Sequence, residues 1–388
     1  MIEDSLSQTD SENPYAAPVP QSESLLTSVD LAEEQSTVDD PPACWYCGVG
    51  EAIAWFGGTL GVHLAGGIAV LIAAVVVVAI CTGKVPKNVE EPQMMFAVTA
   101  GEMLIFVLAS MLAISIRYWG RTFRELNFSA PDYRHVLIVV LATLPLSFLV
   151  SAWSVPVQLL WTKIVESVPV LSILDQMNGM EVIRDMSRNT SLLMLILVIA
   201  VLPAIGEELV FRGAVGRALI ANLGLWWGVC LTSFLFGCIH IHPVHAIAVI
   251  PLGFAIHLIY LSGRSFWLPM LLHFLNNTFA AISTKTSAVD PLSSATSVTA
   301  WEAAEMLLGA VAVVAFAIAF WQSRVRYIQE DGTECESPRF PVRVATISTV
   351  RRHAGPINSA CWAIAIASSL FCHLLVAIDL LQPMMKAD

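Results

Sequence analysis

Six side chains that could serve in acid, base or hydrogen-bond chemistry lie in three short motifs of this chain. They are Glu207, Glu208, Arg212, His240, His273 and Asn277. All lie within or against apolar stretches long enough to cross a lipid bilayer. An ionisable side chain in hydrocarbon costs at least about 2–3 kcal/mol, so such residues usually have a function. Residue types that can activate water, gathered in such stretches, predict an active site inside the membrane.

Helical spacing divides these candidates by role. Glu208 and Arg212 are four residues apart and share a helix face, so Arg212 is the expected partner of the Glu208 carboxylate. Glu207 points about 100° away around the helix and is left free for chemistry. His273 and Asn277 are also four residues apart and can point together at one ligand atom.

One interpretation of the set is hydrolysis by activated water. Glu207 would take a proton from water as the general base, and His240 would hold or polarise the same water molecule. His273 and Asn277 would donate hydrogen bonds to the oxyanion that forms on a cleaved amide. One such donor contributes about 3–4 kcal/mol in the transition state.

The residues alone leave other interpretations open. Glu207, His240 and His273 have the ligand types of a catalytic zinc site, although no HExxH motif is present. A divalent metal such as zinc therefore stays open, and no other cofactor is indicated. The Glu207, Glu208 and Arg212 set could also be a purely structural ion network. A proton-coupled transporter would be expected to contain internal repeats, which the sequence does not show.

Neighbouring histidines receive plainer interpretations. His242 and His245 flank Pro243 and are interpreted as interfacial polar residues. His63 and His257 lie in apolar stretches without a pattern that suggests a partner. None of these four histidines is predicted to take part in the site.

The composition places the six candidates in a membrane protein. The chain has 388 residues, of which 56% are hydrophobic and 13% charged, whereas soluble domains have roughly 25% charged residues. The net charge of −11 comes from the first 51 residues, which contain eleven acids and no Lys or Arg. The remainder is neutral, so nothing indicates nucleic-acid binding.

Apolar length predicts an all-α, polytopic transmembrane bundle of eight to ten spans. The nine best candidates are about 56–81, 96–116, 136–160, 191–220, 225–240, 244–261, 266–282, 303–321 and 360–381. An amphipathic connector covers 161–190, and a polar, arginine-bearing linker covers 322–358.

Four segments follow from this division. Residues 1–52 form an acidic tail that cannot bury enough apolar surface to order itself. Residues 53–190 contain the first spans and the connector, residues 191–285 form the predicted catalytic core, and residues 286–388 hold the last spans and the basic linker. Under strict alternation the arginine-rich loops fall on one face, which the positive-inside rule makes cytoplasmic, together with the N-terminus.

The three motifs reach a similar depth. With the turn at 222–224 as the cytoplasmic end, Glu207 and His240 both lie roughly 20 Å from that end. His273 and Asn277 lie roughly 15–20 Å from the turn at Gly263. Because the hydrocarbon core is about 30 Å thick, one shared site can contain all of them.

Together, the motifs resemble the CAAX protease and bacteriocin-processing family, also called the type II CAAX prenyl endopeptidase or Abi family. The matching signature is Glu-Glu-x-x-x-Arg from Glu207, Phe-x-x-x-His ending at His240, and His-x-x-x-Asn from His273. The order and spacing match over about 190–285, roughly a quarter of the chain.

The resemblance implies an α-helical intramembrane endopeptidase of a bacterial inner membrane. Its first Glu and first His, which would activate water, map to Glu207 and His240. The oxyanion site maps to His273 and Asn277. By the same resemblance, two supporting residues map to Glu208 and Arg212. The implied substrate is a membrane-associated protein or peptide, with prenylation or other lipidation left open. The alternative is a non-catalytic immunity or scaffold protein of the same fold.

Overall fold

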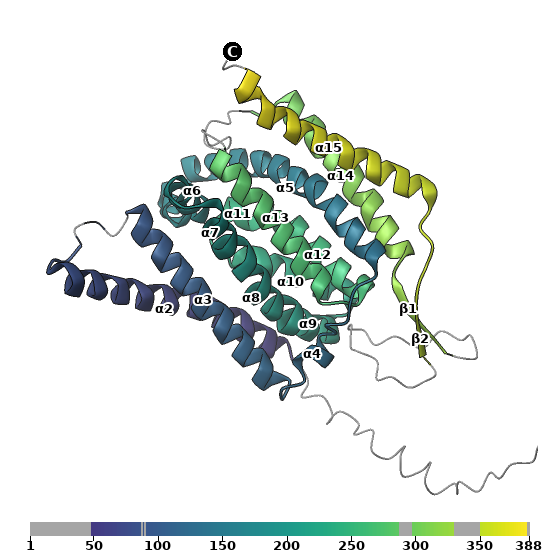
Figure 1. Ribbon diagram of the computed structural model, residues 1–388, viewed down its shortest axis with the longest axis horizontal. Helices are drawn as coiled ribbons and strands as arrows, with labels where there is room; N and C mark the ends of the chain where they lie inside the picture. Colours follow the sequence, from purple (N-terminus) through teal and green to yellow (C-terminus); the bar gives the residue numbers. More distant parts are fainter. Residues whose placement is uncertain (1–47, 87, 89–90, 287–296, 330–349, 386–388) are drawn as a thin grey trace, which may run out of the picture. The chain divides into compact units, whose positions relative to one another are not determined.

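The computed structural model describes residues 48–86, 88, 91–286, 297–329 and 350–385. Residues 1–47 of the predicted acidic tail lie outside this description. The described part is helical apart from one small two-stranded sheet, which confirms the predicted helical bundle (Figure 1).

The helices and strands follow one another along the chain in a simple order. The first group is α2 (Val49–Thr82), α3 (Pro92–Arg117), α4 (Thr122–Glu125), α5 (Tyr133–Ser167), the 3₁₀ helix η1 (Pro169–Met177) and α6 (Gly179–Asn189). The second group is α7 (Leu192–Ile196), η2 (Leu197–Val201), α8 (Leu202–Val210), η3 (Phe211–Val215), α9 (Gly216–Leu223), α10 (Leu225–Cys238), α11 (Pro243–Ala248) and α12 (Ile250–Gly263). The last group is α13 (Trp267–Thr286), α14 (Ala300–Gln322), β1 (Val325–Gln329), β2 (Val350–Ala354) and α15 (Ser359–Met385).

Within the described residues, six helical segments are long and apolar enough to cross a membrane. They are Val49–Thr82, Pro92–Arg117, Tyr133–Ser167, Leu192–Leu223, Pro243–Gly263 and Glu302–Gln322. Leu225–Cys238 and Ser359–Leu375 are shorter apolar helices. The chain is therefore a helical integral membrane protein, and the total of nine spans stays a prediction.

Two segments differ from the sequence-based expectation. Within the linker at 322–358, β1 and β2 pair antiparallel, with Val325 opposite Ala354, whereas the sequence predicted an all-α protein. Branched and aromatic residues in β1 favour this extended backbone. The predicted span 225–240 ends as a helix at Cys238, which leaves His240 in a turn.

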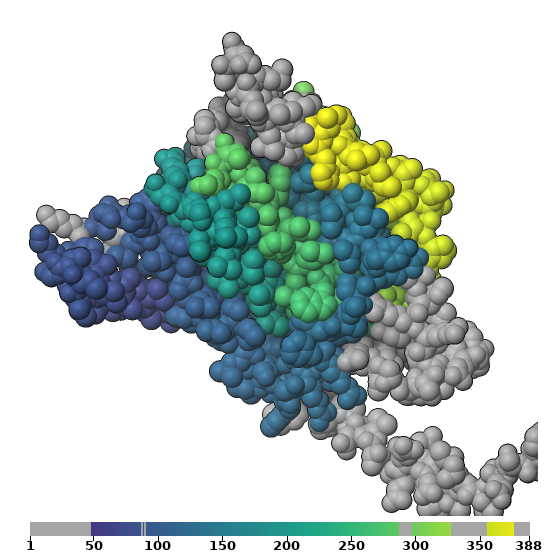
Figure 2. All heavy atoms as spheres, viewed as in Figure 1, coloured from purple at the N-terminus to yellow at the C-terminus, as the bar shows by residue number. Residues whose placement is uncertain are grey.

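Apolar packing joins segments that are distant in sequence. One buried cluster combines Ile138 of α5, Ile256 of α12, Leu272 of α13 and Phe316 of α14. A second combines Phe106 of α3 with Phe211 of η3 and further residues of α9 and α10. In Figure 2 the side chains of α7 and α8 (teal) and α13 (green) form one continuous face, in agreement with the contacts among these helices.

Candidate active site

The segment that carries the two glutamates is a distorted helix. Leu192–Leu223 is continuous, but η2 and η3 have π-helical hydrogen bonding and flank α8 on both sides. π-helical turns within α-helices occur frequently at functional sites. Pro203 lies just after η2 and has no N–H, so it cannot make the usual helical bond to the carbonyl of Ile199.

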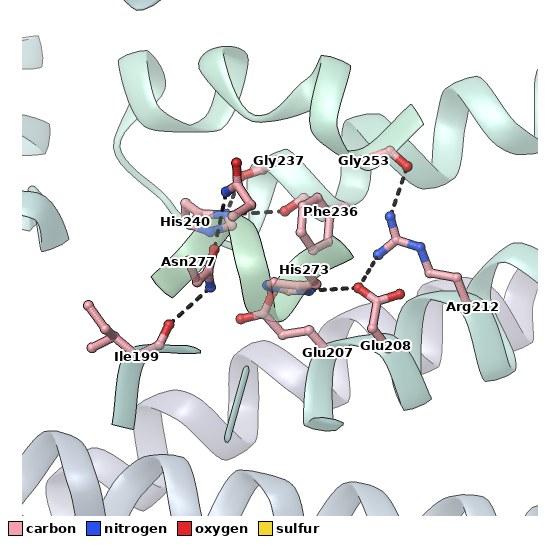
Figure 3. A network of polar contacts seen from close by, with 11 residues as sticks. Ile199, Glu207, Glu208, Arg212, Phe236, Gly237, His240, Gly253, His273 and Asn277 are labelled. Atoms are coloured by element: carbon pink, nitrogen blue, oxygen red, sulfur yellow. Dashed lines mark hydrogen bonds and ion pairs between the residues drawn. The ribbon is translucent and has the colours of Figure 1, made fainter. Parts of the chain in front are cut away.

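Glu208 links two of the three motifs through one carboxylate oxygen. Its side chain is fully buried, and Oε1 accepts hydrogen bonds from Nη1 of Arg212 at 3.0 Å and from Nδ1 of His273 at 2.7 Å (Figure 3). The predicted Glu208–Arg212 pair is thus present. The bond to His273, from α13, was not expected from helical spacing, because that residue lies in a separate helix.

Arg212 ties this pair to two further helices. Its Nη2 donates to the backbone carbonyl of Gly253 in α12 at 2.8 Å. Its guanidinium carbon lies 4.7 Å from the centre of the Phe236 ring in α10. A buried charge requires such compensation. The same ring packs edge-on against His240 and His273, so Phe236 contacts three polar residues of the site.

Glu207 is buried, but unlike Glu208 it is not held by hydrogen bonds from Arg212 and His273. The whole residue is 6% exposed, and its Oε2 lies 3.9 Å from Nε2 of His273. Among the described residues, this Oε2 has no hydrogen-bond partner; Oε2 of Glu208 also has none, but Glu208 is held through its other oxygen. The carboxylate therefore keeps a free acceptor in an apolar interior, as the predicted general base requires.

His240 occupies the turn after α10 and is half-buried. Its Nδ1 lies 3.2 Å from the carbonyl of Phe236 and 3.3 Å from that of Gly237. Carbonyl oxygens only accept, so Nδ1 must donate and Nε2 of the neutral ring keeps a lone pair.

His273 and Asn277 share a face of α13 but contact different groups. Nδ2 of Asn277 donates to the carbonyl of Ile199 in η2 at 3.0 Å, whereas His273 contacts the two glutamates. Asn276 donates to Oδ1 of Asn277 at 3.3 Å and accepts from the Ser147 hydroxyl of α5 at 2.9 Å.

Three residues around Asn277 were missed in the sequence analysis. Ser147, Ile199 and Asn276 set the orientation of its amide, yet serine, isoleucine and asparagine in an apolar stretch give no distinctive pattern. The one available signal was Pro203, which prevents the usual helical bond to Ile199.

Comparison with known proteins places these motifs in one family segment. Residues 189–279 match the family model described as Type II CAAX prenyl endopeptidase Rce1-like. This Rce1-like segment runs from the end of α6 into α13 and contains all six candidate residues. It therefore agrees with the resemblance seen in the motifs.

One curated relative supports the Rce1-like match. It is the Bacillus subtilis (strain 168) protein named "Putative membrane peptidase YdiL", which is 27% identical over 89 residues. The alignment covers 23% of this chain and 36% of YdiL, so the chain spans about a third of that relative's length. No solved structure matches the chain.

A metal site was the second interpretation of the same residues. No group of three or more His, Cys, Asp or Glu side chains is arranged to hold a metal ion in the described parts of the chain. Glu207, His240 and His273, the ligand set considered above, are thus not arranged as a ligand group within the Rce1-like segment.

Of the histidines outside the six candidates, His63 differs from expectation and His257 does not. His63 of α2 pairs with Glu102 of α3, so it does have a partner within the apolar bundle. Its ring also packs against Phe106. His257 is 1% exposed and lies against Gly216 of α9, where a Cβ atom would lie 2.2 Å from the imidazole.

Proposed function

We propose that this chain is an intramembrane endopeptidase that hydrolyses a peptide bond by water activated at Glu207 and His240. The observation that carries the proposal is the buried Glu207 oxygen without a hydrogen-bond partner among the described residues. Beside it, Glu208 holds His273 at 2.7 Å. A free base next to an oriented imidazole, in an apolar interior, suits general base catalysis.

The proposed reaction begins with a water molecule between Glu207 and His240. Glu207 takes one proton, and the water oxygen bonds to the carbonyl carbon of the peptide. The carbonyl oxygen becomes an oxyanion. The C–N bond then breaks as the proton on Glu207 passes to the leaving nitrogen. This sequence uses one carboxylate as base and then as acid.

His273 and Asn277 are the proposed donors to the oxyanion. Glu208 accepts from Nδ1 of His273, so Nε2 can donate only when it also carries a proton, and this Nε2 lies 3.9 Å from Oε2 of Glu207. Asn277 gives one N–H to Ile199 and retains a second. Removing one such donor costs about 3–4 kcal/mol in the transition state.

The proposed substrate is a membrane-associated protein or peptide. The family description refers to CAAX prenyl substrates, and the YdiL name to a membrane peptidase. A prenylated C-terminal peptide is therefore the first substrate to test, with a transmembrane peptide as the second. The basic loops favour a cytoplasmic N-terminus. The similarity to a Bacillus subtilis protein favours a bacterial inner membrane.

The decisive measurement is cleavage of quenched fluorescent peptides by the full chain in detergent. We expect Glu207→Gln and His240→Ala each to lower the rate by about 10²–10⁴-fold, the usual contribution of general acid–base groups. Glu166→Gln is the matched control, because Glu166 is exposed on α5. Normal cleavage by both site variants would refute the peptidase proposal. Absence of cleavage by the wild-type chain, with a biological effect that survives both substitutions, would favour the scaffold alternative.

A further inference from the structure

The turn that carries His240 has an unusual backbone. Ile241, between α10 and α11, has φ of +63°, in the left-handed region. A β-branched residue is strongly disfavoured there, and such strain persists only when the surroundings hold it in place. Ile241 is 51% exposed, so its own side chain is not what holds the turn.

His242, the next residue of the turn, contacts η1 in the connector between α5 and α6. His242 is 4% exposed, although its position had suggested an interfacial residue. Its Nε2 lies 3.4 Å from Oδ1 of Asp175 in η1. The same Asp175 oxygen accepts a hydrogen bond from Nε1 of Trp161 in α5 at 2.7 Å. Asp175 therefore joins α5 to the turn.

Apolar packing surrounds this polar contact. Trp161 lies edge-on to the His242 ring, with centroids 6.3 Å apart. Trp161, Val157 of α5 and Val244 of α11 form a buried cluster, against which Leu174 of η1 packs. The turn is thus held from the α5 and η1 side.

The turn and the start of α11 also contact His240, the proposed catalytic residue. The centroid of the His245 ring, in α11, lies 4.2 Å from the centroid of the His240 ring. The backbone N–H of His242 donates to the carbonyl of His240 at 2.6 Å. A displacement of His242 is therefore transmitted directly to His240.

We propose that Asp175 and His242, together with Trp161, are positioning residues that hold the strained turn and so keep the His240 imidazole in its orientation within the site. This rests on the proposed function of His240. Trp161 and Asp175 lie outside the Rce1-like segment at 189–279. The connector that precedes this segment thus supplies part of the catalytic geometry.

Substitutions at Asp175 separate positioning from folding. We expect Asp175→Ala to lower kcat by at least about tenfold with KM nearly unchanged, because a displacement of about 1 Å can cost on the order of a hundredfold. Asp175→Asn keeps an acceptor oxygen for Trp161 and should retain most of the activity. Asp185→Ala, at an exposed position of α6, is the control and should behave as wild type.

A second background tests the role of strain. Glycine adopts a positive φ without strain, so Ile241→Gly should make the turn depend less on Asp175. The loss caused by Asp175→Ala should then be at least about threefold smaller in the Ile241→Gly background, as expected for coupled residues. An equal loss in both backgrounds, or unchanged kcat in Asp175→Ala, overturns the proposal.

Hydrogen exchange gives a readout that does not need activity. Asp175→Ala should accelerate amide exchange at Ile241, His242 and residues 244–246 and leave α13 unchanged. Unchanged exchange in the turn overturns the positioning role even if the enzyme is active. If the wild-type chain cleaves nothing, the peptidase proposal fails, and the exchange result still decides whether Asp175 holds the turn.

Discussion

At the scale of single residues, Glu208 explains why two adjacent glutamates are present. Its Oε1 accepts hydrogen bonds from both Arg212 and His273, whereas Glu207 only approaches His273, at 3.9 Å. Oε2 of each glutamate has no hydrogen-bond partner in the described structure. Glu208 thus compensates buried charge and orients an imidazole. Glu207 is left for the proposed proton transfer. Removing one member of such a buried pair typically costs about 3–5 kcal/mol, so Glu208 also supports the fold.

Asn276 gives a residue-scale prediction about Asn277. Because Asn276 and Ser147 fix the Asn277 amide, Asn276→Ala should lower kcat by about tenfold with little change in KM, consistent with a misdirected oxyanion donor. Peptide cleavage measures both constants. Ser147→Ala should show a smaller loss in the same direction. Ser167→Ala, at an exposed position of the same helix, is the control. A rise in KM alone would contradict the orientation role.

At the scale of elements, the approach of α3 to α8 positions Glu207. A Cβ atom on Gly206 would lie 2.6 Å from Cε1 of Phe106, so only glycine permits this approach. Phe106 in turn packs against the His63 ring, and His63 pairs with Glu102. The contact between α2 and α3 therefore supports the helix that carries Glu207, the proposed base.

Gly206→Ala tests this close approach. We expect a loss of about 1–3 kcal/mol in the free energy of unfolding from overpacking, together with reduced cleavage because Glu207 moves. Adding Phe106→Leu should restore part of both. Gly58→Ala is the matched control in α2, because a Cβ atom there would meet no atom within 4 Å. Equal effects of the Gly206 and Gly58 substitutions would show that the close approach has no role.

The start of α5 gives a pH-dependent prediction. Asp132 caps this helix, and its hydrogen bond from the Arg134 side chain lowers the pKa of its carboxyl below the ordinary value. Because its pKa is lower in the folded state, the Asp132 carboxylate stabilises the protein above about pH 4. This stabilisation is lost as the pH falls through the pKa of the folded state. Asp132→Asn keeps the cap but should remove up to about 1 kcal/mol of this acid-sensitive stability. Unfolding measured between pH 2 and 6 tests it, and an unchanged pH profile would contradict it.

At the scale of the whole molecule, the helices of the predicted segments pack together. The cluster of Ile138, Ile256, Leu272 and Phe316 draws on all three predicted segments between 53 and 388. The core that contains the six candidate residues is thus packed against helices that precede it and helices that follow it in the sequence.

α10, with 14 residues, is only about 21 Å long, shorter than a hydrocarbon core of about 30 Å. His240 can therefore follow a helix end within the membrane.

The topology prediction belongs to the same scale. A reporter that matures only in the cytoplasm should be active at the N-terminus and inactive at the C-terminus, because nine spans place the two ends on opposite faces. A reporter at the turn near Gly224 should be active, as the depth estimate assumed. Activity at both termini would show an even number of spans.

The sequence determined much of this protein because composition and spacing act locally. Apolar length predicted a helical membrane bundle, in which six described segments are long and apolar enough to cross a membrane. The spacing of Glu208 and Arg212 predicted their pair, since residues four apart on a helix are neighbours. The motif order also predicted the Rce1-like segment at 189–279.

Only the tertiary structure decided which helix faces meet. Spacing placed His273 and Asn277 on one face, but the packing of α13 directs His273 to the glutamates and Asn277 to Ile199. Likewise, the contact of Asp175 with His242 joins residues 67 positions apart. Such contacts depend on how distant helices pack around a shared apolar core, and periodicity within one helix does not determine that packing.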